Sequence, residues 1–323
     1  NNELKLINKY NLNDNNQQIR IMTDSENLCE SKKFKLNEIN SFLTNLDTNM
    51  NSNNQEDQKV EKSLASKDFA NSKKPKNILY LEIISSSYES AGKMIKITPE
   101  GMEHSQRKNK PNDGISYFGY VEKDNSVPID YIIKPREEVV DDRFIGQHFQ
   151  IKYNPTDFQY YIKDLGNGFG TFVKIVDWVE VKNNFLLSIG ENYIVITIGV
   201  DNDLLLNENI IKNEENENLI NLKVFSGNIR HGTFSFTPDK KSFLIGRAAE
   251  CDICIDDGML SRFHCTFEFR DNKWFLKDGK IENGKDKKST NGTWIYAYED
   301  ILIKQGLIFK ANHNLFICSI ETE

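Results

Sequence analysis

Four polar side chains in the last third of the sequence have the chemistry that a phosphate group requires. Arg247 carries a planar guanidinium, whose fork of donors suits a phosphate or a carboxylate. Ser261 and Thr290 add hydroxyl donors, and Asn291 can both donate to and accept from a peptide backbone. Each residue alone is ordinary in a surface loop, but the four together predict a site for a dianionic phosphate.

The segments that carry these residues alternate between short strands and polar turns. Cys251–Ile255 and Cys265–Phe269 alternate apolar with polar residues, as half-buried strands do. Gly246 ends an apolar run just before the arginine, and Gly292 permits a tight turn before a further strand. This pattern predicts that the polar side chains lie on loops between strands, where binding surfaces are commonly built.

The order Gly-Arg, Ser-Arg-x-His and Ser-Thr-Asn-Gly-Thr resembles the forkhead-associated (FHA) domain, a β-sandwich whose loops bind phosphothreonine. The resemblance implies that Arg247, Ser261 and Thr290 contact the phosphate. It also implies that Asn291 holds the main chain of the ligand and that Arg262 lies beside it. The positions that the resemblance makes structural are Gly246, His264 and Gly292.

Residues 77–200 resemble a second, divergent copy of the same domain, which predicts an internal repeat. Many short apolar runs with turn signals between them indicate a sandwich in this region too. The framework residues of the two copies match in pairs, which are Gly119 with Gly246, His148 with His264, and Gly170–Thr171 with Gly292–Thr293.

The phosphate donors have no counterparts in this first copy. The residues at the four ligand positions are Tyr120, Ile145, Gly168 and Phe169. Apolar side chains cannot stabilise a dianion, because its desolvation requires charge-assisted hydrogen bonds. We therefore interpret the first copy as structural, or as a surface for unphosphorylated partners.

The composition along the chain predicts an all-β protein of two FHA-type sandwiches preceded by a largely disordered arm. Residues 1–76 are rich in Asn, Lys, Glu and Ser and poor in apolar side chains, so disorder is expected there. The sandwiches are expected at 77–200 and 221–323, joined by an acidic, Asn-rich linker at 201–220.

One amphipathic stretch interrupts the arm. Leu36, Ile39, Leu43 and Leu46 recur at helical spacing, which predicts a short helix over 35–47. An isolated helix of this length is marginal in water, so the 36–46 face would form on a partner. The alternative interpretation is a few leucines in an unstructured tail.

Charge, hydropathy and cysteine usage limit the partners and the compartment. A formal net charge of -7 argues against nucleic-acid binding, which needs a basic surface. No apolar stretch approaches the length of a membrane span. The five cysteines are scattered, which indicates a reducing compartment. We expect an intracellular protein of the cytoplasm or nucleus, with the cytoskeleton or cilium as alternatives.

Neither catalysis nor metal binding has a recognisable motif in the sequence. Cys251 and Cys254 form a C-x-x-C pair, which could indicate zinc or redox chemistry. Both fall within an alternating strand pattern, however, and no second pair follows at ligand spacing. We therefore expect strand residues here, no cofactor, no metal and no enzymatic activity.

These observations favour a phosphothreonine-dependent adaptor that recognises phosphorylated partner proteins through its C-terminal FHA domain. One alternative is a constitutive assembly protein, for example of a cytoskeletal or ciliary array, in which both sandwiches pack independently of phosphorylation. Another is the targeting half of a longer enzyme, because FHA domains commonly accompany kinases or ligases.

Overall fold

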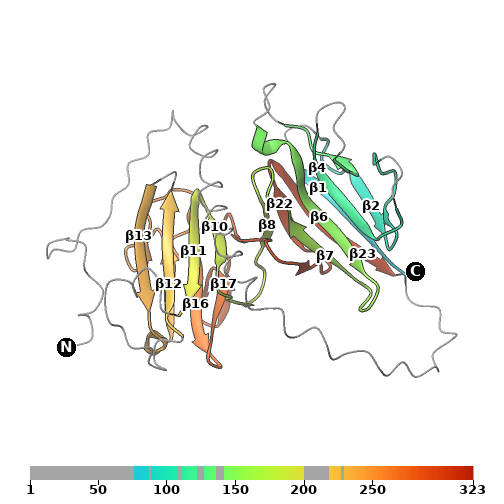
Figure 1. Cartoon of the computed structure of the whole chain (residues 1–323). Helices are drawn as coiled ribbons and strands as arrows, with labels where there is room; N and C mark the ends of the chain where they lie inside the picture. Colours follow the sequence, from blue (N-terminus) through green and yellow to red (C-terminus); the bar gives the residue numbers. More distant parts are fainter. Residues whose placement is uncertain are drawn as a thin grey trace, which may run out of the picture. The chain divides into compact units, whose positions relative to one another are not determined.

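The computed structural model describes residues 76–86, 89–107, 111–121, 127–135, 142–199, 218–226 and 229–322 (Figure 1). The predicted arm with its helix, and nearly all of the acidic linker, lie outside these residues. Strands dominate the described part, and its helical elements are short 3-10 turns such as η1 (Asp142–Phe144) and η3 (Pro238–Lys240). The predicted all-β class is confirmed. Within the described residues, no helix has the length and apolar character needed to span a bilayer.

The described residues form two compact units, and unit 2 is made of two separate segments of the chain. Unit 1 comprises the described residues of 174–295, and unit 2 comprises those of 76–173 together with 296–322. The chain therefore leaves unit 2 after residue 173, completes unit 1, and returns to unit 2 at residue 296.

Unit 1 is a sandwich of two sheets with aromatic side chains between them. Phe236 from one sheet stacks on Phe243 from the other at 4.1 Å between ring centroids, and Phe243 stacks on Phe267 at 4.6 Å. One sheet has the order β15 (Ile253–Cys254), β14 (Ser242–Gly246), β16 (Cys265–Arg270), β17 (Lys273–Asp278), β9 (Val179–Glu180). The other has the order β13 (Ile229–Phe236), β12 (Ile220–Ser226), β11 (Asn192–Ile198), β10 (Phe185–Ile189), β20 (Thr293–Tyr296). A separate hairpin pairs β18 (Lys280–Glu282) with β19 (Lys285–Lys287).

Unit 2 is built in the same way. Phe149 stacks on Phe118 at 4.4 Å and meets Phe309 of the opposite sheet at 5.4 Å. One sheet has the order β5 (Tyr131–Ile132), β4 (Ile115–Tyr120), β6 (Gly146–Asn154), β7 (Gln159–Asp164), β21 (Ile301–Leu302). The other has the order β8 (Thr171–Lys174), β22 (Ile308–Ala311), β23 (Asn314–Thr322), β1 (Asn77–Ser85), β2 (Met94–Thr98), β3 (Gly101–Met102).

The two units share one topology, and each is completed by strands from the other half of the chain. β9, β10 and β11 hold the places in unit 1 that β21, β22 and β23 hold in unit 2. β11 pairs antiparallel with β12, with Ile194 opposite Val224. β23 likewise pairs antiparallel with β1, with Cys318 opposite Leu81. Three strands that precede the linker thus complete unit 1, and the three C-terminal strands complete unit 2.

This exchange differs from the segments predicted from sequence. Residues 185–198 were expected within a sandwich at 77–200, and residues 301–322 within one at 221–323, but each group belongs to the other unit. The physical reason is that alternation fixes which face of a strand is buried and leaves its neighbour undetermined. Because β9–β11 and β21–β23 share the same alternating pattern, the sequence alone does not decide which set completes which sandwich.

Candidate functional site

Two of the predicted phosphate donors lie on loops at one end of unit 1 that are joined through the backbone. Arg247 follows β14 directly, and Ser261 lies in the loop between β15 and β16. The Arg247 N–H donates to the Ser261 carbonyl at 3.1 Å, and the Ala248 N–H donates to the Arg262 carbonyl at 3.1 Å. These bonds fix the separation of the arginine and the serine, although 13 residues of chain lie between them.

The third loop, between β19 and β20, brings Thr290 onto Ser261. The Thr290 N–H donates to Ser261 Oγ at 2.9 Å, and Ser261 Oγ lies 3.4 Å from Thr290 Oγ1. Ser261 is half-buried and Thr290 is exposed. Two hydroxyl groups therefore face solvent side by side, where both can donate to one anion.

The two arginines beside these hydroxyls are exposed and differ in their surroundings. The Arg262 guanidinium lies 3.9 Å from the Glu250 carboxylate and 5.8 Å from the centroid of the Phe263 ring. Arg247 is also exposed, and no ion pair within the described residues includes it. Both guanidiniums are exposed, and among the described residues only that of Arg262 has an ion-pair partner.

Asn291 and Gly292 shape the third loop. The Asn291 amide donates to the Met259 carbonyl at 2.7 Å, so in this structure it holds the main chain of the neighbouring loop. Gly292 has φ +79°, and a Cβ there would lie only 2.5 Å from Cε of Lys174. The positive φ favours glycine at this position, whereas the flexible end of the Lys174 side chain could move aside.

A buried carboxylate that the sequence analysis did not single out as a site residue anchors the same loop. Asp278, at the end of β17, accepts hydrogen bonds from the Ser289 N–H at 3.1 Å and the Ser289 hydroxyl at 2.6 Å. It also accepts one from the Thr293 hydroxyl at 2.8 Å. Ser289 Oγ in turn accepts from the Gly292 N–H at 2.9 Å. Serine and threonine on both sides of an Asn-Gly turn were the sequence signal for such an anchor.

His264 links the β15–β16 loop to the β19–β20 loop. Its Nδ1 accepts from the Ser261 N–H at 3.2 Å, which leaves Nε2 to donate to the Gly292 carbonyl at 3.1 Å. Burial lowers the pKa of His264, partly offset by the Gly292 carbonyl, which favours the charged form. The neutral tautomer with its proton on Nε2 satisfies both bonds, so the imidazole acts as a brace.

The hairpin β18–β19 adds positive charge next to these loops. Lys280 Nζ lies 4.0 Å from the centroid of the Phe263 ring, and Lys288 Nζ donates to the Val176 carbonyl. Lys287 is paired with Glu282 at 3.4 Å, and Lys277 is paired with Asp286. Four of the lysines at this end of the unit are therefore held in place by named contacts.

Comparison with known families assigns this region. Residues 243–305 match the family model described as the FHA domain. The chain contains an FHA domain. FHA domains are phosphopeptide-binding protein-interaction modules, and all the loops described above fall within the matched residues. No curated protein sequence matches the chain.

The matched region extends beyond unit 1. Residues 243–295 of the FHA match belong to unit 1, whereas 296–305 belong to unit 2 and include β21. Strands β9, β10 and β11, which complete the sandwich around the FHA loops, lie before the match begins. The folded unit that carries the FHA loops is thus larger than the matched segment. It includes β9, β10 and β11, which lie outside the match, and it lacks residues 296–305, which lie inside the match.

Some residues of unit 2 that the sequence pairs with the FHA framework have comparable geometry, and others have different partners. A Cβ on Gly119 would lie 2.1 Å from the Gly146 carbonyl oxygen, as one on Gly246 would lie 2.3 Å from that of Arg262. His148 Nε2 donates to the Phe144 carbonyl at 2.6 Å, and its Nδ1 faces the Asn312 amide at 2.7 Å. Burial lowers the pKa of His148 to about 4.

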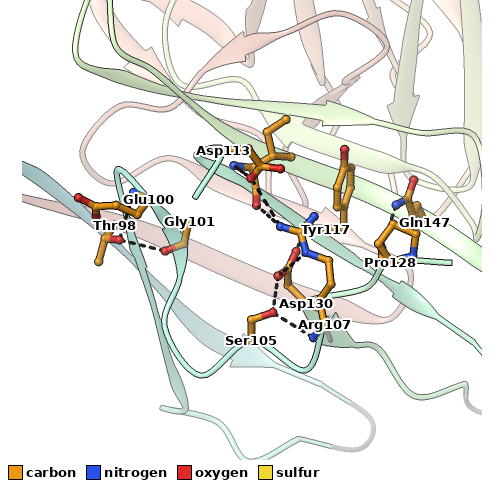
Figure 2. Close-up of polar contacts among 11 residues, drawn as sticks. Thr98, Glu100, Gly101, Ser105, Arg107, Asp113, Tyr117, Pro128, Asp130 and Gln147 are labelled. Atoms are coloured by element: carbon orange, nitrogen blue, oxygen red, sulfur yellow. Dashed lines mark hydrogen bonds and ion pairs between the residues drawn. The ribbon is translucent and has the colours of Figure 1, made fainter. Parts of the chain in front are cut away.

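A carboxylate recurs at equivalent places in the two units, buried at Asp130 in unit 2 and exposed at Asp252 in unit 1. Asp130, just before β5, accepts from the Tyr117 N–H at 2.8 Å, and Asp252, just before β15, accepts from the Leu244 N–H at 2.8 Å. Figure 2 shows how unit 2 elaborates this point, because Ser105 donates to Asp130 and the Arg107 guanidinium lies 3.4 Å from it. The network ties the residues after β3 to the sheet edge.

Aromatic side chains stand at two of the four positions of unit 2 that the sequence pairs with the phosphate donors. Phe144 lies 5.8 Å from Tyr120, 5.5 Å from Phe169 and 4.5 Å from His148, measured between ring centroids. The Phe169 N–H donates to Asn312 Oδ1 at 2.7 Å. Two of the four unmatched positions, Tyr120 and Phe169, thus flank Phe144 in an aromatic cluster.

Proposed function

We propose that the FHA loops of unit 1 bind phosphothreonine in partner proteins and that the chain serves as a non-enzymatic adaptor. The observation that carries this proposal is the pair of solvent-facing hydroxyls on Ser261 and Thr290 beside Arg247. Charge-assisted hydrogen bonds from a guanidinium are the strong kind, and hydroxyls complete a phosphate's remaining acceptors. The preference for threonine over serine rests on the resemblance to the FHA family.

A pre-formed loop arrangement supports the binding of a ligand at this end of unit 1. Asp278 and His264 fix the loops through buried hydrogen bonds. A rigid site of this kind loses little conformational entropy when a ligand binds. In the proposed mechanism, Arg247 supplies the charge, Ser261 and Thr290 supply donors, and Asn291 exchanges its contact with Met259 for the ligand's main chain.

The aromatic cluster of unit 2 favours a second candidate function for that unit. Tyr120, Phe144 and Phe169 cluster at one end of unit 2. The corresponding end of unit 1 carries the proposed phosphate donors. Phe144 is buried, whereas Tyr120 and Phe169 are half-buried, so these two rings would contact an apolar, unphosphorylated partner. The chain would then combine a regulated contact through unit 1 with a constitutive contact through unit 2, as an assembly protein would.

A phosphopeptide library bound to the full-length chain tests the proposal. We expect enrichment of phosphothreonine peptides by the wild type and loss of that enrichment with Arg247→Ala. Lys152→Ala removes an exposed cation from β6 and serves as the matched control. Equal capture of phosphorylated and unphosphorylated peptides by the wild type would reject phosphate recognition, and enrichment of phosphoserine alone would reject the threonine preference.

A further inference from the structure

We propose that Asn192, which precedes the linker, positions Ser261 of the FHA loops, so that phosphopeptide binding requires chain from both sides of the linker. The proposal rests on the proposed function of unit 1. It concerns residues outside the FHA match and adds no direct ligand contact. Its basis is a hydrogen-bonded path from the β10–β11 turn to the loop that carries Ser261.

Asp257 is the point at which the β10–β11 turn meets that loop. Its Oδ2 accepts from the Asn192 amide at 2.7 Å and from the Glu191 N–H at 3.0 Å. A Cβ on Gly190 would lie 2.5 Å from the same oxygen, so the turn backbone approaches the carboxylate closely. Asn192 is almost completely buried. The carboxylate is thus held by donors that are themselves fixed within a sheet.

The other end of Asp257 sets the loop that leads to Ser261. Its Oδ1 accepts from the Met259 N–H at 2.7 Å, and its carbonyl accepts from the Leu260 N–H at 3.0 Å. Ser261 follows immediately. The Met259 carbonyl is the group that accepts from Asn291. A shift of Asp257 would therefore move the Ser261 hydroxyl and disturb the contact between the two loops.

A second set of contacts from the same early segment reaches the third loop. The Lys288 ammonium donates to the Val176 carbonyl, and the Lys174 side chain crosses over Gly292. Both Lys174 and Val176 precede the linker, as does Asn192. The loops that carry Ser261 and Thr290 are each supported by residues 174–192, which the exchange of strands places in unit 1.

The composite unit can be tested without any ligand. We introduce a protease site within residues 201–217 of the full chain, together with Ile194→Cys and Val224→Cys, which replace register partners on β11 and β12. After cleavage and oxidation, we expect a disulfide to join the two fragments on a non-reducing denaturing gel. Ile196→Cys with Val224→Cys is the control, because Ile196 is paired with Leu222 instead. Fragments that separate, or link equally in the control, would overturn the composite unit.

The role of Asn192 is tested by its effect on binding of a library-selected phosphopeptide to the intact chain. Asn192→Leu removes the amide at similar volume, and we expect about tenfold weaker binding, as for loss of one hydrogen bond to a charged group. Asn192→Asp places a second carboxylate against Asp257, so the two carboxyl groups would share a proton on acidification. We therefore expect its affinity, relative to wild type at each pH, to recover as the pH falls from 8 to about 5.5.

The outcomes separate this inference from the proposed function. A wild type that binds no phosphopeptide would end both the proposed function and the positioning role, while the disulfide result would still decide the composite unit. Wild-type binding with unchanged affinity in Asn192→Leu would overturn the positioning role alone. Affinity of Asn192→Asp that stays at a constant ratio to wild type across this pH range would also overturn it, since a purely structural defect would not titrate.

Discussion

Asp278 shows how single buried residues prepare the exposed donors of the FHA loops. Its carboxylate is buried and receives three hydrogen bonds from Ser289 and Thr293, on either side of the Asn291–Gly292 turn. Thr290 and Asn291, which we propose contact the ligand, are exposed. The residues that stabilise the loop are thus next to, but different from, the residues proposed to contact the ligand.

Replacing Asp278 with alanine should destabilise unit 1. Removal of the carboxylate leaves the Ser289 and Thr293 donors buried without this acceptor, and such losses cost roughly 1–3 kcal/mol per group. We expect a decrease of about 2–4 kcal/mol in the free energy of unfolding. All three tryptophans of the chain, Trp178, Trp274 and Trp294, belong to unit 1. Denaturant unfolding followed by tryptophan fluorescence therefore reports on this unit.

Asp256→Ala is the matched control for this measurement, because Asp256 is exposed one residue before the Asp257 anchor. It should change the unfolding free energy by less than about 0.5 kcal/mol, as surface substitutions usually do. An Asp278→Ala variant as stable as Asp256→Ala would show that the three hydrogen bonds do not stabilise the loop.

At the scale of elements, the paired strands β6 and β7 of unit 2 carry two buried groups whose pKa values are shifted in opposite directions. Burial lowers the pKa of His148 from 6.5 to about 4 and raises the pKa of Asp164 from 3.8 to about 6. Asp164 accepts from the Tyr296 hydroxyl at 2.5 Å and the Gly166 N–H at 2.8 Å, and these contacts together with Thr171 partly offset the effect of burial on its pKa.

The two shifts have opposite consequences for stability. As the pH falls from about 6.5 to 4, the unfolded chain protonates His148 before the folded one does, so stability is lost. As the pH falls from about 6 to 3.8, the folded chain protonates Asp164 first, so stability is gained. The two effects largely cancel between pH 6 and pH 4.

The substitution Asp164→Asn should reveal the contribution of His148 to the pH dependence of stability. The amide keeps an acceptor for Tyr296 and does not titrate, so we expect unit 2 to lose up to roughly 3 kcal/mol between pH 6.5 and 4, as a shift of this size implies. Denaturant unfolding followed by the NMR signals of β6 and β7 would measure this. An acid dependence of Asp164→Asn as flat as that of the wild type would contradict the assignment.

The two units are organised by an exchange of strands: β9–β11 complete unit 1, and β21–β23 complete unit 2. Unit 2 depends on β22 and β23, which pair with β8 and β1, and these strands are the last of the chain. Unit 1 depends on β10 and β11, which precede the linker. Strands β22 and β23 therefore complete the unit that also contains β1.

Truncation after residue 295 should damage the unit that lies earlier in the sequence. We expect β1 and β2 to lose protection from amide hydrogen exchange, because β1 loses its partner β23. Unit 1 should keep its tryptophan emission and its unfolding midpoint, since its strands remain present. The opposite result, with unit 1 unfolded and unit 2 intact, would indicate two contiguous domains.

The sequence allowed part of this organisation to be predicted. The expected alternation of Cys251–Ile255 appears as alternating burial, although only Ile253–Cys254 forms a strand. The FHA resemblance identified residues that the fold brings together, such as Ser261 with Thr290. The anchors Asp257 and Asp278 act across many residues of chain or from within a strand, and local patterns do not report such contacts. The exchange of strands likewise depends on pairings that periodicity leaves open.

The most direct test of phosphopeptide binding by unit 1 is a calorimetric titration of the full chain with one library-selected peptide. The peptide is supplied with phosphothreonine, with phosphoserine and unmodified, and each form is titrated into wild type, Arg247→Ala and Lys152→Ala. We predict binding of the phosphothreonine form, with affinity about tenfold to a hundredfold lower in Arg247→Ala and unchanged in Lys152→Ala. Equal affinity of wild type and Arg247→Ala for that form would contradict the account.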